Sequence, residues 1–223
     1  MCIDTLASQH NGAKNYREVG IVLQRCIAIL CVCCIFLMPL WIRADLLFGY
    51  LHIDKRVSEV VVTFVRVRSL GIPADIVSES YEKYLMAVGE MHIPMYYNIF
   101  IAFMVLACCV LFVNCLGFGY ASLAWAVVIS EYAGCACQIY LSLQCVSVQR
   151  TLHPWSMDMF KEWKEFLALG LPGLLMTCSE WWAFEILTIF SSFLGTEAVA
   201  AQAVIVQLCT LCFMFPLGLA ITV

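Results

Sequence analysis

The sequence predicts an all-α membrane protein, a polytopic helical bundle with about six transmembrane helices. Its 223 residues are 63% hydrophobic and only 13% charged, whereas a soluble domain carries about 25% charged residues. The mean hydropathy is +0.91. At roughly 20 apolar residues per span, this length accommodates about six spans and their loops. These values exclude a disordered chain, a nucleic-acid-binding protein and an ordinary cytosolic enzyme.

Most of the 14 cysteines lie inside apolar runs, where small, soft side chains pack well. Cys31, Cys33 and Cys34 offer soft ligands for a metal, but this cluster has neither zinc-finger spacing nor a nearby histidine in the sequence. We therefore interpret the cysteines as packing residues within the membrane and expect no metal site.

The first expected span covers residues 19–42, and Trp41 suits the membrane interface at its end. Residues 43–58 carry several charges and predict a loop. Residues 59–88 are the next expected span, although they carry many charges around Gly71 and Pro73. Such a helix cannot face lipid on all sides, so we expect it to line a water-filled cavity. An interfacial helix or a segment outside the membrane are the alternatives.

Residues 91–130 contain no Lys, Arg, Asp or Glu. This run is too long for one helix and suits two spans, at 94–113 and 120–143, joined by a turn at 114–119 that contains asparagine and glycine. A polar stretch at 150–165 follows. Two more spans are expected, one at 166–193 and one that begins after the turn at 194–197 and continues to Val223.

Lysine and arginine residues are unevenly divided between the two sides of the expected bundle. Seven lie on the side that holds the N-terminal segment and the 150–165 stretch, and three lie on the opposite side. The positive-inside rule therefore places the 150–165 stretch in the cytoplasm.

Three carboxylates lie inside expected spans: Glu131, Glu180 and Glu185. A carboxylate near the bilayer centre costs about 2.5–3.5 kcal/mol on insertion scales, so it is kept where it faces a cavity or a partner. Such a group can exchange a proton for an organic cation, which is the simplest chemistry of antiport. The alternative is that each glutamate hydrogen-bonds a neighbouring helix. On a regular helix Glu180 and Glu185 point roughly 140° apart, so they share a pocket only where the helix is distorted, which Pro172 favours.

Several neighbouring side chains are candidates for lining the same cavity. Trp181 and Trp182 offer cation–π contacts to an organic cation, although ordinary packing is the alternative. Gln202 and Gln207 are polar and lie within the last span. The sequence shows no phosphate-binding loop and no Ser–His–Asp set, so we expect neither ATP hydrolysis nor enzymatic catalysis.

Two regions resemble eukaryotic multidrug and toxic compound extrusion (MATE) transporters. Residues 4–9 (DTLASQ), 12–16 (GAKNY) and 19–25 (VGIVLQR) resemble the segment between the second and third spans of that family. Residues 171–176 (LPGLLM), 180–185 (EWWAFE), 194–195 (LG) and 200–202 (AAQ) resemble spans seven and eight, and 216–218 (PLG) fits the later part of span eight. The likeness runs through essentially the whole chain and is weakest over residues 43–115.

The resemblance implies twelve helices in two six-helix lobes around a central cavity. Residues 1–149 would be the remainder of the N-terminal lobe, from the end of span two to span six. Residues 150–165 would be the cytoplasmic inter-lobe linker, and 166–223 the start of the C-terminal lobe, with spans seven and eight. The sequence is therefore expected to be a fragment.

The same resemblance assigns roles to particular residues. Glu180 and Glu185 match the C-lobe carboxylates that the family associates with cation binding and proton coupling. Gln207 departs from animal-type members, which often carry a third carboxylate in this span. Glu131 stands where the family more usually has a neutral polar residue, so no role is carried over to it.

We therefore expect an antiporter that exports organic cations or other xenobiotic or amphipathic solutes in exchange for protons. It is expected to need no cofactor besides the coupling ion. Its expected partners are the substrate and the lipid bilayer, not nucleic acid or ATP. The expected location is the plasma membrane or a vacuolar or vesicular membrane. The alternative is a truncated or degenerate membrane protein without transport activity of its own.

Overall fold

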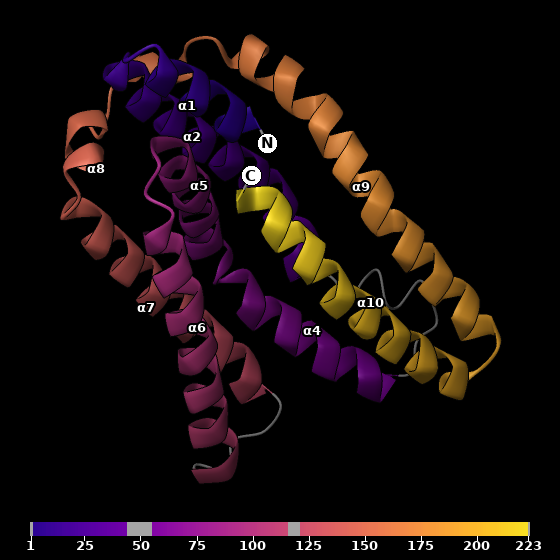
Figure 1. Cartoon of the computed structure of the whole chain (residues 1–223). Coiled ribbons are helices and arrows are strands. Elements are labelled where there is room, and N and C mark those ends of the chain that lie inside the picture. The colour runs from indigo at the N-terminus through magenta and orange to yellow at the C-terminus, as the bar shows by residue number, and fades with distance from the viewer. Residues whose placement is uncertain (1, 44–54, 116–120, 223) are drawn as a thin grey trace. The chain divides into compact units, whose positions relative to one another are not determined.

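The chain is helical in the part that the computed structural model describes, residues 2–43, 55–115 and 121–222 (Figure 1). Every regular element within these residues is a helix, which confirms the all-α fold class. The chain divides into two compact units, Met1–Phe166 and Leu167–Val223. The assignment of these units to two transporter lobes stays a prediction.

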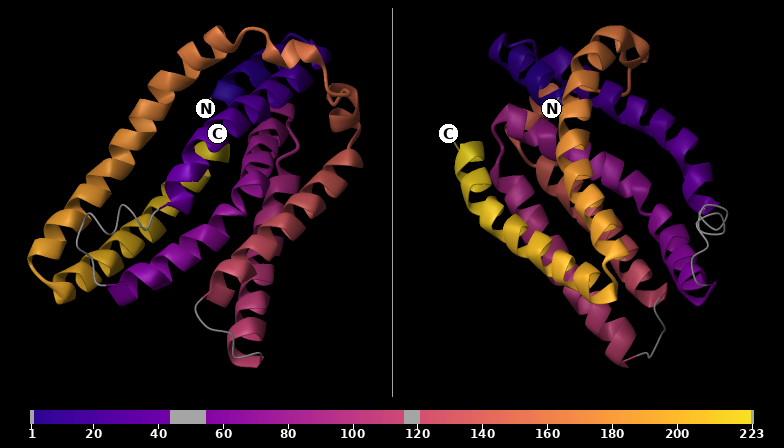
Figure 2. Two further views of the ribbon diagram at one scale, coloured as in Figure 1. Left: turned by 180° about the vertical axis from the view of Figure 1, so that it is seen from behind. Right: turned by 90° about the vertical axis from the view of Figure 1, so that its right-hand side faces the viewer.

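The first unit contains most of the helices. They are α1 (Cys2–Gly12), α2 (Tyr16–Ile42), α4 (Lys55–Ser69), α5 (Ile72–Val88), α6 (His92–Val110), the π-helix η1 (Leu111–Cys115), α7 (Ala121–Leu143), α8 (Val146–Thr151) and the 3-10 helix η2 (Met157–Phe160). The long helices α6 and α7 run side by side in both figures (Figure 1, Figure 2).

The core of the first unit lies between α1, α2 and α5. Its most buried side chains, each at most 2% exposed, include Ala7, Val22, Leu23, Tyr84 and Leu85. Residues 19–27 of α2 are all buried, whereas residues 30–42 are largely exposed and apolar. A contiguous apolar surface of this kind marks contact with a membrane or another protein segment.

The expected span 59–88 is built from two helices rather than one. α4 ends at Ser69, and α5 begins at Ile72 with Pro73 in its first turn, where the missing N–H of proline is tolerated. The amide of Ala74 donates to the Gly71 carbonyl over 2.9 Å, which starts the new helix. α4 already begins at Lys55, so the loop expected over 43–58 is shorter; its residues 44–54 lie outside the described residues.

Four of the described helices are long and apolar enough to cross a membrane: Tyr16–Ile42, His92–Val113, Ala121–Leu143 and Glu197–Leu219. They lie at four of the expected spans. The turn expected at 114–119 lies mostly outside the described residues.

The second unit consists of the main part of α9 (Trp163–Phe193) and α10 (Thr196–Thr222). α9 has 31 residues, which is more than the roughly 20 that a span needs. The turn between the two helices contains Gly195, whose φ of +111° suits glycine. None of the side chains described between residues 167 and 219 is fully buried.

Candidate functional site

The two predicted coupling carboxylates lie on α9. From residue 166 to residue 193, Glu180 and Glu185 are the charged side chains, and both are exposed. The helix is continuous through Pro172. The spacing of five residues therefore directs the two carboxylates to different faces, roughly 140° apart. Within the described residues, neither glutamate has an ion-pair partner.

The predicted cavity-lining residues of the second unit are also accessible. Trp181 and Trp182 are each 59% exposed. On α10, Gln202 is half-buried and Gln207 is exposed. The hydroxyls of Ser179 and Thr188 donate to carbonyls four residues earlier in α9, so they add little free polar surface. The role of these residues in lining a cavity stays a prediction.

Glu131 lies in the first unit and has a different environment. It is on α7 with only 7% of its side chain exposed, and it forms a bidentate pair with Arg68 of α4. Arg68 Nη1 donates to Glu131 Oε2 over 2.9 Å, and Arg68 Nη2 lies 2.8 Å from Glu131 Oε1. Arg68 Nη2 also donates to Asp75 Oδ2 of α5 over 2.9 Å. One guanidinium therefore joins three helices and faces two carboxylates.

The break between α4 and α5 fits this cluster of Arg68, Asp75 and Glu131. A Cβ at Gly71 would lie 2.3 Å from Glu131 Oε2 and 2.7 Å from Arg68 Nη1, so a side chain there would displace the ion pair. The hydroxyl of Tyr132, next to Glu131, donates to the Leu70 carbonyl over 3.0 Å. α7 thus stabilises the break between α4 and α5 in two ways: Glu131 pairs with Arg68, and Tyr132 donates to the Leu70 carbonyl.

Sequence reasoning identified Glu131 but not its partners. Arg68 and Asp75 were visible as charges in the 59–88 stretch, seven residues apart and on either side of Gly71. A charged helix and a carboxylate in another span each need a partner within the membrane. That requirement could have suggested a contact between Glu131 and the charges of the 59–88 stretch.

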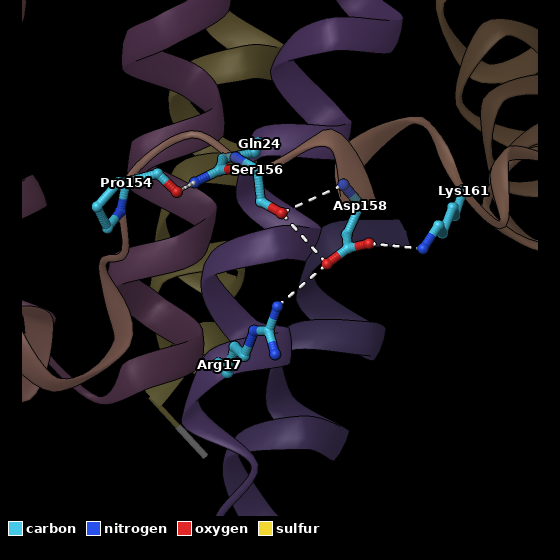
Figure 3. Close-up of polar contacts among 6 residues, drawn as sticks. All are labelled: Arg17, Gln24, Pro154, Ser156, Asp158 and Lys161. Atoms are coloured by element: carbon cyan, nitrogen blue, oxygen red, sulfur yellow. Dashed lines mark hydrogen bonds and ion pairs between the residues drawn. The ribbon is translucent and has the colours of Figure 1, made fainter.

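The polar stretch before α9 is attached to α2 (Figure 3). The side chain of Gln24, which is 4% exposed, donates to the carbonyls of His153 and Pro154 and accepts from the amide of Ser156. These distances are 3.0, 3.3 and 3.0 Å. One amide side chain thus satisfies three backbone groups of the linker.

Ion pairs reinforce the same attachment. Asp158 Oδ2 lies 3.1 Å from Arg17 Nη2 of α2, and Asp158 Oδ1 lies 2.7 Å from Lys161 Nζ (Figure 3). The hydrogen bond from Lys161 is the main reason that the pKa of Asp158 is lowered, and the same bond raises the pKa of Lys161. Arg25, with 5% of its side chain exposed, lies 3.0 Å from Glu162 Oε2.

Comparison with known sequences identifies similar proteins along the whole chain. A profile of the MatE family matches residues 1–114. Multidrug and toxin extrusion protein 1 of Oryctolagus cuniculus is 31% identical over 221 residues, which cover 99% of this chain and 39% of that protein. The Homo sapiens protein of the same name is 31% identical, with 98% and 38% covered. Multidrug and toxin extrusion protein 2 of Mus musculus is 28% identical, with the same coverage. The chain spans about two fifths of the length of these relatives.

Two solved structures share the fold. The crystal structure of the eukaryotic MATE transporter AtDTX14 superposes with a TM-score of 0.81 at 22% identity, over 91% of this chain and 46% of that one. The inward-facing conformation of a multidrug resistance MATE family transporter of the MOP superfamily gives a TM-score of 0.64 at 18% identity, over 77% of this chain and 39% of that one.

Proposed function

The chain belongs to the MatE family and is an integral, multi-pass membrane protein; on this premise we propose that it acts in a secondary active antiporter. The transported solutes are organic cations or other xenobiotic, amphipathic molecules, and protons move in the opposite direction. Such exchange breaks no covalent bond, so it requires neither ATP nor a cofactor, and the protein is not an enzyme.

The observation that carries this proposal is the pair Glu180 and Glu185 on α9. An ionisable side chain within a membrane helix costs free energy of insertion, and such residues usually mark a pathway for ions or solutes. α9 has the length of a membrane helix. Neither carboxylate is neutralised by an ion pair within the described part of the chain. Each can therefore hold either a proton or a cation, and the competition between the two couples their movements.

Trp181 and Trp182 support the same assignment. Both rings are exposed and lie four and three residues before Glu185, so they share its side of α9, and the face of an indole ring attracts an organic cation. A site that combines a carboxylate with indole rings favours large, weakly hydrated cations over inorganic ones. In alternating access, protonation of the carboxylate on one side of the membrane would release the organic cation there.

The test is transport by the purified protein in liposomes. Liposomes with an acidic interior should accumulate a radiolabelled tetraalkylammonium ion, and uptake should stop when a protonophore removes the gradient. Glu180→Gln and Glu185→Gln should each reduce uptake to the level of protein-free liposomes. Glu197→Gln is the matched control, because Glu197 is an exposed glutamate in the first turn of α10.

Two outcomes would contradict the proposal. Unchanged uptake by Glu180→Gln and Glu185→Gln would show that these carboxylates do not couple transport. Uptake by the unsubstituted protein that equals protein-free liposomes would favour the alternative, a membrane protein without transport activity of its own.

A further inference from the structure

Three metal-ligating side chains converge at one end of the first unit. Glu90 and His92 lie at the turn between α5 and α6, and Cys145 lies between α7 and α8. One ligand atom from each residue lies within 4.8 Å of the other two. His92 Nδ1 is 3.5 Å from Glu90 Oε2. This group could not be recognised from the sequence, because His92 and Cys145 lie 53 positions apart.

The backbone holds both turns in place. α5 ends at Gly89, whose φ is +90°, and the amide of Glu90 donates back to the Leu85 carbonyl over 2.9 Å, as in a Schellman cap. On the other side, the amide of Cys145 donates to Ser142 over 3.0 Å, and the Cys145 carbonyl accepts from Gln149. The three ligands are therefore presented by ordered backbone rather than by long loops.

The donor set selects the class of metal. Thiolate, imidazole and carboxylate together are ligands for Zn²⁺ and related transition metals, whereas Mg²⁺ and Ca²⁺ prefer oxygen alone. Around a tetrahedral Zn²⁺ the donor atoms lie roughly 3.5 Å apart. The three donor atoms lie within 4.8 Å of one another, so binding requires them to approach by no more than about 1 Å. His92, with 55% of its side chain exposed, has the freedom to make this movement.

The electrostatics of the group also favour a cation. A divalent ion would relieve the repulsion between a Cys145 thiolate and the Glu90 carboxylate. On the orientation that the sequence predicts, this end of the unit faces the cytoplasm, where thiols stay reduced.

We propose that Glu90, His92 and Cys145 bind one Zn²⁺ ion, with a fourth position left for water or another ligand. The ion would tie the turn between α5 and α6 to the turn between α7 and α8. This site uses none of the residues proposed for transport, so its test does not depend on transport.

The experiment titrates the purified protein in detergent with Co²⁺ as a spectroscopic probe for the Zn²⁺ site. One equivalent of Co²⁺ should produce a thiolate-to-cobalt charge-transfer band, and one equivalent of Zn²⁺ should remove it. Cys145→Ala should abolish the band. Glu90→Gln and His92→Asn should weaken binding by roughly tenfold or more. Zn²⁺ at one hundred times its Kd should raise the midpoint of thermal unfolding by on the order of 5 °C.

Other cysteines supply the controls. Cys137→Ala removes a half-buried thiol from α7 and should leave the band unchanged. Circular dichroism shows whether each variant keeps its helices, and the exposed position of His92 makes His92→Asn the variant that is safest for folding. The proposal is overturned if the band persists in Cys145→Ala, if Cys33→Ala removes it instead, or if the unsubstituted protein binds no metal.

Discussion

Replacing Arg68 with methionine should destabilise the first unit more than replacing either of its partners. The change keeps most of the side-chain volume but removes the cation that, among the described residues, pairs with both Asp75 and Glu131. Glu131, with 7% of its side chain exposed, would lose both hydrogen bonds of a bidentate pair and would have to take up a proton or stay buried without a counter-charge.

The magnitude follows from the burial of each partner. Removing one member of a buried ion pair costs about 3–5 kcal/mol, and the low end applies here because 34% of the Arg68 side chain is exposed. Asp75 is 33% exposed, so its pair with Arg68 contributes at most about 1 kcal/mol. We therefore expect a loss of about 3 kcal/mol for Arg68→Met and about 1 kcal/mol or less for Asp75→Asn.

Thermal unfolding in detergent, followed by circular dichroism, measures the effect. For a chain of this size, 1 kcal/mol shifts the midpoint by about 2–4 °C, so Arg68→Met should lower it by roughly 6–12 °C. Arg66→Met, at an exposed arginine that donates to the Ile42 carbonyl, is the matched control. In the double variant Arg68→Met with Glu131→Gln, the buried charge is gone, so most of the stability should return.

Two results would refute this reasoning. One is a shift for Arg68→Met no larger than the shift for Arg66→Met. The other is a double variant whose loss equals the sum of the two single losses, because the coupling between Arg68 and Glu131 would then be zero.

Other predictions concern the attachment of the linker to α2. Gly20→Ala should cost about 2 kcal/mol or more in thermal unfolding, because its Cβ would lie 2.2 Å from the backbone oxygen of Thr151. Gln24→Ala removes three hydrogen bonds and should cost about 2–3 kcal/mol in the same assay. The pKa of Asp158 is lowered, so its contribution to folding stability is fully present above the ordinary value of 3.8 and is lost as the pH falls through the lower folded value. Asp158→Asn should cause the same loss of stability at neutral pH. The measurement is the rate of trypsin cleavage after Lys161, which should increase.

The long apolar helices could be predicted from the sequence because their composition alone requires a membrane. The uncharged run 91–130 predicts two helices with a turn between them, and α6 and α7 follow that division. The break between α4 and α5 was less accessible. Gly71 and Pro73 were visible, but membrane helices often continue through proline. What stabilises the break is tertiary contact, since Glu131 and Tyr132 bind residues beside it from another helix.

The candidate sites show the same limit. Glu131 pairs with Arg68 of a neighbouring helix, and its role in lining a cavity stays a prediction. Its partner could not be named beforehand, because Arg68 lies 63 residues away. The group of Glu90, His92 and Cys145 was missed for the same reason. For Glu180 and Glu185 the assignment as coupling residues stays a prediction.

The segment 19–25 (VGIVLQR) acquires a physical role from these contacts. Gly20 provides the space in which the backbone at Thr151 approaches α2. Gln24 supplies a donor and an acceptor from one side chain, a combination that neither glutamate nor leucine offers at neutral pH. Arg25 pairs with Glu162, the residue before α9, whose φ of +58° is unfavourable for a residue with a Cβ. Residues 19–25 therefore hold the segment 151–162 in place by close packing, hydrogen bonds and an ion pair. This segment leads into α9, the helix that carries Glu180 and Glu185.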